Sequence, residues 1–136
     1  MHICQDRHIC KAVRGMSSKF DDCIARSGYP IDIHDPTGKG VRAAWVKGDG
    51  AYDIPYRCLI PKVVANLLVA GRCISTTHET LATTRLTPSC MATGQAAGTA
   101  ASLACRQDIM PLEIDVSELQ EQLRLGGALL SKNEMI

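Results

Sequence analysis

Aromatic side chains and long apolar runs are both scarce in this chain. One Phe, one Trp and three Tyr are its only aromatic residues in 136, so we expect a core built mainly from Ala, Leu, Ile and Val. No stretch reaches the ~18 apolar residues of a membrane-spanning helix. Asp6, Arg7 and His8 interrupt the start of the chain, where a signal peptide would be apolar. These absences favour a cytoplasmic protein with no membrane role.

The sequence also lacks an excess of either charge. Fifteen Lys and Arg residues face fourteen Asp and Glu residues, which gives a formal net charge of +1. Proteins that bind nucleic acids usually carry a basic patch or stripe, because the phosphate backbone dominates their affinity. No stretch of this sequence has that character, so we expect no nucleic-acid partner.

Cysteine, in contrast, is abundant, with seven residues and no CxxC pair. An odd count argues against a disulfide framework, and we interpret most of these cysteines as reduced, small apolar side chains. His2, Cys4, His8 and Cys10 form an H-x-C-x3-H-x-C pattern. This spacing matches no common zinc motif, so we predict no metal site. A metal-binding piece remains the weakest alternative, and elemental analysis tests it.

The order of apolar and polar residues predicts a mixed α/β fold, or α+β for a fragment. Residues 1–23 have no clear period, and a short helix is predicted from Phe20 to Arg26. Residues 24–62 predict a small antiparallel meander with strands at 29–34, 41–46 and 52–60. In the first strand Ile31 and Ile33 share one face, and Asp32 and His34 share the other.

Residues 66–106 form the most informative unit. The apolar run 66–71 ends in a glycine and predicts one buried, parallel strand, which is followed by a polar loop over 72–87. Thr87 is a plausible N-cap with Pro88 at the first helical position, and the helix is predicted to run to about residue 106. A capping box at 117–120 opens a short terminal helix within 115–127. Residues 128–136 read as a loose tail.

Small residues crowd the predicted helix after Pro88. Gly94, Gly98 and Ser102 recur every four residues and form one nearly bare stripe. Such a stripe allows a flat ligand, or simply another backbone, to approach closely. The first N–H groups of the helix have no partner inside it and lie at the positive end of its dipole. This end therefore suits an anion or a polarised carbonyl.

Several of these segments resemble the C-terminal part of bacterial FAD-dependent oxidoreductases, in the glutathione-reductase-like flavoprotein superfamily. The resemblance covers roughly residues 24–125. Its specific part is an ordered series of short motifs: NLLVAGRCIS at 66–75, THE at 77–79, Arg85, Pro88, CMA at 90–92 and GQAAG at 94–98. The segments SGYPIDIHD at 27–35 and YDIPYR at 52–57 extend it upstream.

The resemblance implies FAD as cofactor and assigns the residues that contact it. In such proteins the strand leads to the ribityl and pyrophosphate groups, and the next helix begins beside the flavin ring. By position, the cofactor-binding candidates are Gly71, Arg72, Arg85, Pro88, Met91, Ala92, Gly94 and Gln95. Many flavoproteins have an Asp after that first glycine. Arg72 stands there in this chain, and its guanidinium could pair with a phosphate instead.

Two histidines are candidates for catalysis. His78 lies in the segment that the resemblance turns toward the flavin, and an imidazole can exchange protons near neutral pH. His78 is thus the catalytic candidate, although a hydrogen bond that organises the loop is the simpler role. His34 lies on the polar face of its strand, toward the substrate side in the family, and an exposed histidine at a sheet edge is the simpler interpretation.

The strand–GxGxxG–helix unit that holds the ADP half of FAD is missing. Residues 38–43 match G-x-G-x-x-A, but they follow a turn and precede no helical pattern, so we interpret them as a hairpin turn. We therefore expect a partial FAD-binding domain that needs a missing N-terminal FAD-binding segment as partner, acts on a small-molecule substrate and lacks turnover alone. A non-catalytic structural or interaction module is the alternative, and a neighbouring reading frame with GxGxxG would distinguish the two. The exposed sheet edge and bare stripe predict a homo-oligomer.

Overall fold

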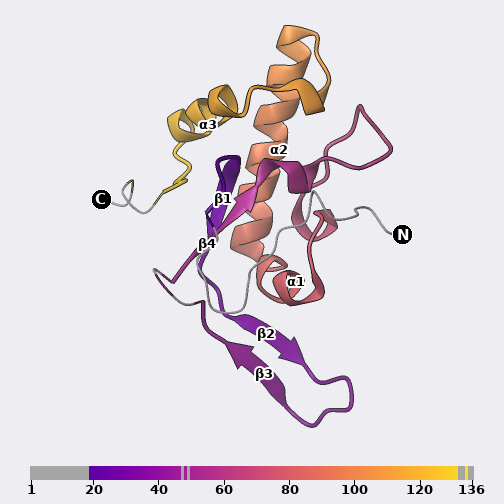
Figure 1. The fold of residues 1–136 in the computed structure, drawn as a ribbon, viewed down its shortest axis with the longest axis vertical. Helices are drawn as coiled ribbons and strands as arrows, with labels where there is room; N and C mark the ends of the chain where they lie inside the picture. Colours follow the sequence, from indigo (N-terminus) through magenta and orange to yellow (C-terminus); the bar gives the residue numbers. More distant parts are fainter. Residues whose placement is uncertain (1–18, 47, 49, 132–133, 135–136) are drawn as a thin grey trace.

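The computed structural model describes residues 19–46, 48, 50–131 and 134. Within this part of the chain the strands come first and the helices follow, as Figure 1 shows. Two small antiparallel sheets of two strands each precede three α-helices. The predicted mixed α/β class is confirmed, but several elements differ from the sequence prediction.

The first sheet pairs the two ends of the β-rich region. Strand β1 (Cys23–Ser27) runs antiparallel to β4 (Tyr52–Pro55), with a bulge near its start. The prediction of a short helix at 20–26 is wrong, because cross-strand pairing decides the backbone conformation here. Arg26 lies opposite Asp53, and the Arg26 Nε donates to the Asp53 Oδ1 at 3.0 Å in a largely buried ion pair.

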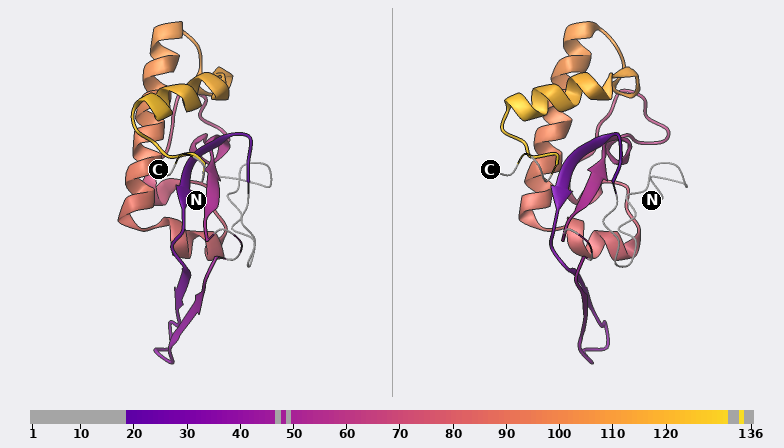
Figure 2. Two further views of the ribbon diagram at one scale, coloured as in Figure 1. Left: turned by 90° about the vertical axis from the view of Figure 1, so that its left-hand side faces the viewer. Right: turned by 60° about the vertical axis from the view of Figure 1, so that its left-hand side comes forward.

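The second sheet is a hairpin that projects from the rest of the molecule (Figures 1 and 2). It pairs β2 (Ile31–His34) with β3 (Val41–Ala44). The Asp35 carboxylate accepts from the Thr37 amide at 2.7 Å in the connecting turn, where Gly38 and Gly40 have positive φ. The hairpin turn predicted for the G-x-G-x-x-A match is thus confirmed. The predicted three-strand meander is wrong. Strand β4 pairs with β1 rather than with the hairpin, so β2 and β3 lie in the sequence between the two strands of the first sheet.

The predicted buried strand at 66–71 is not a strand. Asn66 lies in a turn and residues 67–70 have no regular secondary structure; no strand in the described part of the chain pairs with them, and Leu67 is 45 % exposed. The Val69 amide donates to the Leu59 carbonyl at 2.8 Å, and the Gly71 amide donates to the Thr93 hydroxyl at 3.0 Å. A parallel strand needs a neighbour for its ladder. Short 3-10 turns flank the segment at η1 (Tyr56–Leu59) and η2 (Gly71–Cys73).

Helix α1 (His78–Thr84) occupies the region predicted as a polar loop. The Thr77 hydroxyl caps its first turn by accepting from the Thr80 amide at 3.2 Å. This is ordinary N-cap chemistry, with Glu79 in the first turn, where the helix dipole favours negative charge. The cap explains why a run without an apolar period is helical, and α1 packs against β2.

Helix α2 (Thr87–Gln107) is the longest element, as predicted. Its N-cap is Leu86, with no side-chain cap, so Thr87 and Pro88 are the first two helical residues and the predicted cap is one residue too late. The helix packs against β1 and α3. The buried face carries mostly small side chains at helical spacing, namely Ser89, Thr93, Ala96, Ala100, Leu103 and Ala104.

The chain ends in η3 (Pro111–Glu113) and helix α3 (Val116–Leu125). Asp115 is the N-cap of α3 and accepts from the Ser117 amide at 2.8 Å. The capping box predicted at Ser117 is therefore misplaced by two residues. The tail prediction is also wrong for the part described, because Leu130 is buried and its amide donates to the Glu134 carboxylate at 2.6 Å.

The core lies between the first sheet, α2 and α3, and it is mainly aliphatic, as expected, around two tyrosines. Tyr52 and Tyr56 are both almost fully buried. The Tyr56 hydroxyl donates to the Pro111 carbonyl at 2.8 Å, which satisfies its polar end. Burial raises the pKa of Tyr56 to about 12. Arg57 lies outside this core, where it pairs with Asp22 and stacks over the Phe20 ring at 4.6 Å.

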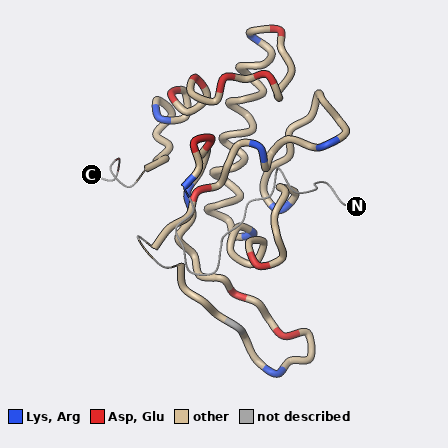
Figure 3. The backbone as a smooth tube through the Cα atoms, in the orientation of Figure 1, with Lys and Arg blue, Asp and Glu red and all other residues tan. Residues whose placement is uncertain are grey.

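Charged residues of both signs are interspersed along the chain (Figure 3). None of the described helices is long and apolar enough to cross a membrane. Cys23 and Cys58 are buried free thiols, in accord with the interpretation as apolar side chains, whereas Cys73 and Cys105 are exposed. The described residues contain no group of three or more potential metal ligands. The His2–Cys10 pattern lies outside them.

Candidate functional site

A sharp corner between α1 and α2 brings together most of the residues that the sequence singled out. Helix α1 ends at its C-cap Arg85, and α2 begins two residues later. The side chain of Arg85 points from this corner toward β2, and its Nη2 donates to the Asp32 carbonyl at 3.3 Å. The corner therefore faces the projecting hairpin rather than the core.

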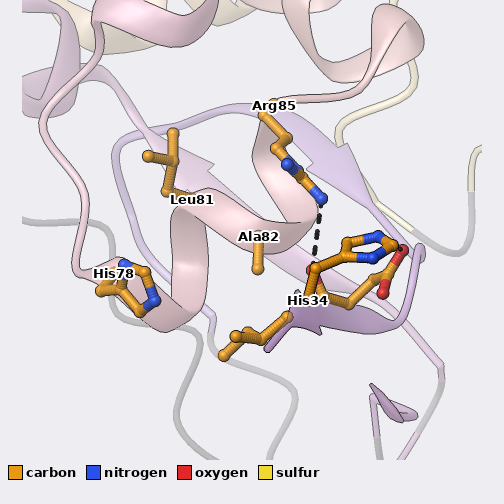
Figure 4. A pocket seen from close by; sticks show the side chains of 7 residues that line it. His34, His78, Leu81, Ala82 and Arg85 are labelled. Atoms are coloured by element: carbon orange, nitrogen blue, oxygen red, sulfur yellow. Dashed lines mark hydrogen bonds and ion pairs between the residues drawn. The ribbon is translucent and has the colours of Figure 1, made fainter. Parts of the chain in front are cut away.

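A small recess lies between α1 and β2 (Figure 4). Its volume is about 170 Å³. One wall is strand β2 and the other is one face of α1, and the lining residues are Asp32, Ile33, His34, His78, Leu81, Ala82 and Arg85. The recess thus joins His78 and Arg85, both predicted site residues, to His34, whose simpler interpretation was an exposed edge histidine.

The polar groups of the recess are unevenly satisfied. Among the described residues, the buried Nε of Arg85 and the buried Oδ1 of Asp32 have no hydrogen-bond partner. The other carboxylate oxygen of Asp32 lies 3.4 Å from the Nε2 of His34. Unpaired buried polar atoms are costly and uncommon in native proteins. The two unpaired atoms therefore lower the local stability of the fold at this recess.

The two histidines do not share one position. His34 lies beside Asp32 on β2, whereas His78 begins α1, and in Figure 4 Ala82 lies between them. Both imidazoles are exposed. The two imidazoles thus lie at separate places along the recess rather than in contact with each other.

A second corner, at Gly71, is tied to the first. Gly71 has φ of +63°, a conformation that favours glycine, and its amide donates to the Thr93 hydroxyl of α2 at 3.0 Å. The next residue, Arg72, donates from Nε to the Arg85 carbonyl at 3.2 Å. Hence the neighbours Gly71 and Arg72 meet Arg85, thirteen residues further along the chain, beside the first turns of α2.

The start of α2 is open on its outer side. Thr87 and Pro88 are exposed, whereas the Ser89 hydroxyl donates to that of Ser27 at 3.0 Å and anchors the helix to β1. A wider recess of about 630 Å³ adjoins this end. Its walls include Tyr29, Trp45, Leu86 and Pro88, and Trp45 is 76 % exposed. This apolar recess was not anticipated, because its residues come from three distant segments.

The remaining predicted cofactor residues lie on different faces of α2. Met91 and Gly94 are exposed, and a Cβ added at Gly94 or Gly98 would meet no atom within 4 Å. Ala92 instead packs against the core. The Gln95 amide donates to the Gly126 carbonyl at 3.2 Å, so this side chain holds the end of α3. The glycine stripe is thus open, which the interpretation as a surface for a flat ligand requires.

Sequence reasoning missed Asp32 and Trp45 as contributors to these recesses. The alternation of β2 does place Asp32 and His34 on one face, so the carboxylate beside the imidazole was available from the sequence. No sequence signal indicates that α1 packs on that face, because α1 itself was predicted as a loop.

The residues present fit a flavin in part. The open stripe at Gly94 and Gly98 allows a flat ring to approach the helix, and the exposed first turn of α2 suits its polarised edge. Within the described residues no strand–glycine turn–helix unit exists for the ADP half, since the one glycine match lies in the β2–β3 turn.

A family model described as FAD dependent oxidoreductase matches residues 2–123. No curated protein and no solved structure matches the chain.

Proposed function

Because the chain belongs to the family of FAD-dependent oxidoreductases, we propose that it forms the C-terminal, flavin-contacting portion of such an enzyme. The observation that carries the proposal is the meeting of Gly71, Arg72 and Arg85 beside the exposed first turns of α2. FAD is the cofactor of this family, and when bound it accepts a hydride from the substrate. The substrate in this proposal is a small organic molecule.

Each carried-over residue has a physical role available to it. The first turn of α2 offers partial positive charge to the electron-rich edge of the ring. Gly94 leaves the helix surface bare, so that the ring can lie close to the backbone. Arg72 carries a guanidinium able to pair with a cofactor phosphate. His78 remains the candidate proton carrier, because it lines a recess beside this corner.

The proposal includes a partner. Binding of the ADP half requires a glycine-rich turn at a helix N-terminus, which the described residues do not provide. We propose that a separate N-terminal FAD-binding segment supplies it and that the chain lacks turnover without that segment. Segment 66–70, which no strand of the described residues pairs with, is a surface available for this association or for pairing with a second copy of the chain.

The visible absorption spectrum tests this function. The purified chain is mixed with FAD, alone and together with the N-terminal half of a full-length family member, and each sample is passed through gel filtration. We expect flavin colour to be retained with the chain only in the mixture. A chain that stays colourless in both samples would contradict the proposal.

A matched pair of variants places the flavin on α2. Gly94→Leu fills the stripe near the helix start and should abolish retention of colour in the mixture. Ser102→Leu adds the same side chain two turns further along the exposed stripe and should leave retention unchanged. Equal loss in both variants would point to the stripe as an association surface, which favours the alternative of a non-catalytic module.

A further inference from the structure

The recess between α1 and β2 holds more hydrogen-bonding capacity than the protein uses. An arginine carries five N–H donors in a planar fork. Within the described residues the side chain of Arg85 makes one hydrogen bond, from Nη2 to the Asp32 carbonyl, and its Nε has none. The Nε of this half-buried guanidinium is thus a buried donor without a partner among the described residues, and an unpaired buried donor beside a recess points to a ligand.

We propose that this recess binds the carboxylate of a small organic acid, with Arg85 as the anchor. The inference rests on the proposed function and deepens it, because it names the class of substrate that the flavin enzyme would oxidise. A guanidinium matches the two oxygens of a carboxylate in geometry as well as in charge. His34 and His78 lie along the same recess and can donate further hydrogen bonds to the bound acid.

The size and lining of the recess restrict the acid. A volume of about 170 Å³ is well below that of pockets for larger ligands, which span roughly 300–1,000 Å³. The side chains of Leu81 and Ala82 from α1, with Ile33 from β2, form its apolar part. An acid of a few carbon atoms fits these limits, with its carboxylate at Arg85 and its carbon chain over the apolar wall.

The carboxylate of Asp32 lines the same recess, and its negative charge opposes a bound anion unless a neighbouring cation offsets it. Its Oδ1 is buried, and its Oδ2 lies 3.4 Å from the His34 imidazole. Asp32 thus faces His34 and orients that ring, while the Arg85 guanidinium remains the cation available to a bound anion. Asp32 acts here as a positioning residue, and Arg85 and His34 are the groups that touch the acid.

The wild-type chain without flavin provides the first test. His34 and His78 ring resonances are followed by NMR at low ionic strength during titration with acetate, with acetamide as the uncharged isostere and with inorganic phosphate. We expect acetate to produce saturable shifts at His34 that acetamide does not produce. Equal shifts with acetate and acetamide, or no saturation, would overturn the proposal. Tighter binding of phosphate than of acetate would overturn it in favour of a cofactor phosphate site.

Variants then locate the anchor. Arg85→Gln removes the charge and should weaken acetate binding by about ten-fold or more, since hydrogen bonds to charged groups carry that much free energy. Arg106→Gln removes an exposed arginine at the other end of α2 and should leave the affinity unchanged. Equal affinity in both variants would overturn the assignment. If Arg85→Gln fails to fold, Arg85→Lys retains the charge without the planar fork and should still weaken binding.

The outcomes separate this inference from the proposed function. Acetate binding is measured without flavin and without any second segment, whereas the function is tested by retained flavin colour. A chain that binds acetate through Arg85 but never retains flavin would keep the site and refute the function. A chain that retains flavin but does not bind acetate would refute the substrate class alone.

Discussion

Two regions of the molecule treat their polar groups in opposite ways. The body, composed of β1, β4, α2 and α3, pairs its buried ones closely, as in the Arg26–Asp53 ion pair and the hydrogen bond of the Tyr56 hydroxyl to Pro111. The hairpin corner, composed of β2, β3 and α1, leaves Asp32 Oδ1 and Arg85 Nε without partners among the described residues. It also exposes Trp45 to 76 %.

The difference indicates that the body provides most of the stability, whereas the hairpin corner provides the candidate site. Sequences violate the rules of packing and hydrogen bonding mainly where a site requires it. The body obeys those rules and holds the elements in place. The hairpin corner breaks them at the point where the predicted site residues meet, so changes in the two regions should have different consequences.

The largest contrast is expected from isoleucines in equivalent strands. Ile24 of β1 is 1 % exposed, whereas Ile33 of β2 is only half-buried. Ile24→Ala should lower the free energy of unfolding by about 3–5 kcal/mol, because it removes buried methyl groups and leaves a cavity. Ile33→Ala should cost about 1 kcal/mol. Urea denaturation measures both, and equal costs would remove the distinction between the regions.

The buried ion pair of the body should matter more than an exposed one. Asp53→Asn removes the charge opposite Arg26, whose side chain is 13 % exposed, and should cost about 2 kcal/mol, since the hydrogen bond to a charged group is weakened in a buried place. Glu134→Gln changes the more exposed pair with Arg124 and should cost less than about 1 kcal/mol. Thermal unfolding compares the two, and a larger effect at Glu134 would contradict the ranking.

The Thr83 hydroxyl forms hydrogen bonds with both regions, and its removal should have a smaller effect on stability. Thr83 of α1 donates to the Tyr29 carbonyl at 2.6 Å, so the Tyr52 hydroxyl of β4, at 2.9 Å from the same oxygen, is the donor to it. Thr83→Val should cost about 1–2 kcal/mol, because both bonds are lost in a buried place. The control Thr99→Val removes a hydroxyl that donates to the Gln95 carbonyl within α2. A cost for Thr99→Val equal to that of Thr83→Val would show that the link is unimportant.

The smallest effect concerns acid pH and the end of the body. Hydrogen bonds from Arg124 and from the Leu130 and Ser131 amides lower the pKa of Glu134 to about 2. A lowered pKa in the fold means that the anchoring is complete above the ordinary value of 4.5 and is lost as the pH falls toward 2. The Leu130 amide resonance of the folded protein should shift as the pH approaches 2, and it should not do so in Glu134→Gln.

The sequence was sufficient for elements defined by local pattern. The length of α2, the turn at Gly38 and Gly40, and the end of α3 before Gly126 follow from helix and turn chemistry within a few residues. It was insufficient where distant pairing decides, as at β1, where a helical pattern yields to pairing with Tyr52 and Asp53. At the apolar run before Gly71 the prediction of a strand was wrong, because no strand in the described residues pairs with this segment.

The candidate site shows the same limit. Arg85, Gly71 and Arg72 were named from motifs, and the fold places them together. The partnership of Arg85 with Asp32 depends on α1 packing against β2, which no periodicity in either segment indicates. The residues matched to the family therefore indicate the corner, whereas the recess depends on tertiary packing that the motifs do not specify.

The pairing of Ser27 with Tyr52 has a consequence for how this protein can change. Since these residues are opposite each other at the end of the first sheet, the chain between them leaves and returns at one place. The hairpin is thus a topological insertion, whose length and sequence can vary without rethreading the core. Gene-level exchange of residues 28–51 between relatives would transplant one wall of the recess as a unit, and ligand preference could diverge while the scaffold is inherited unchanged.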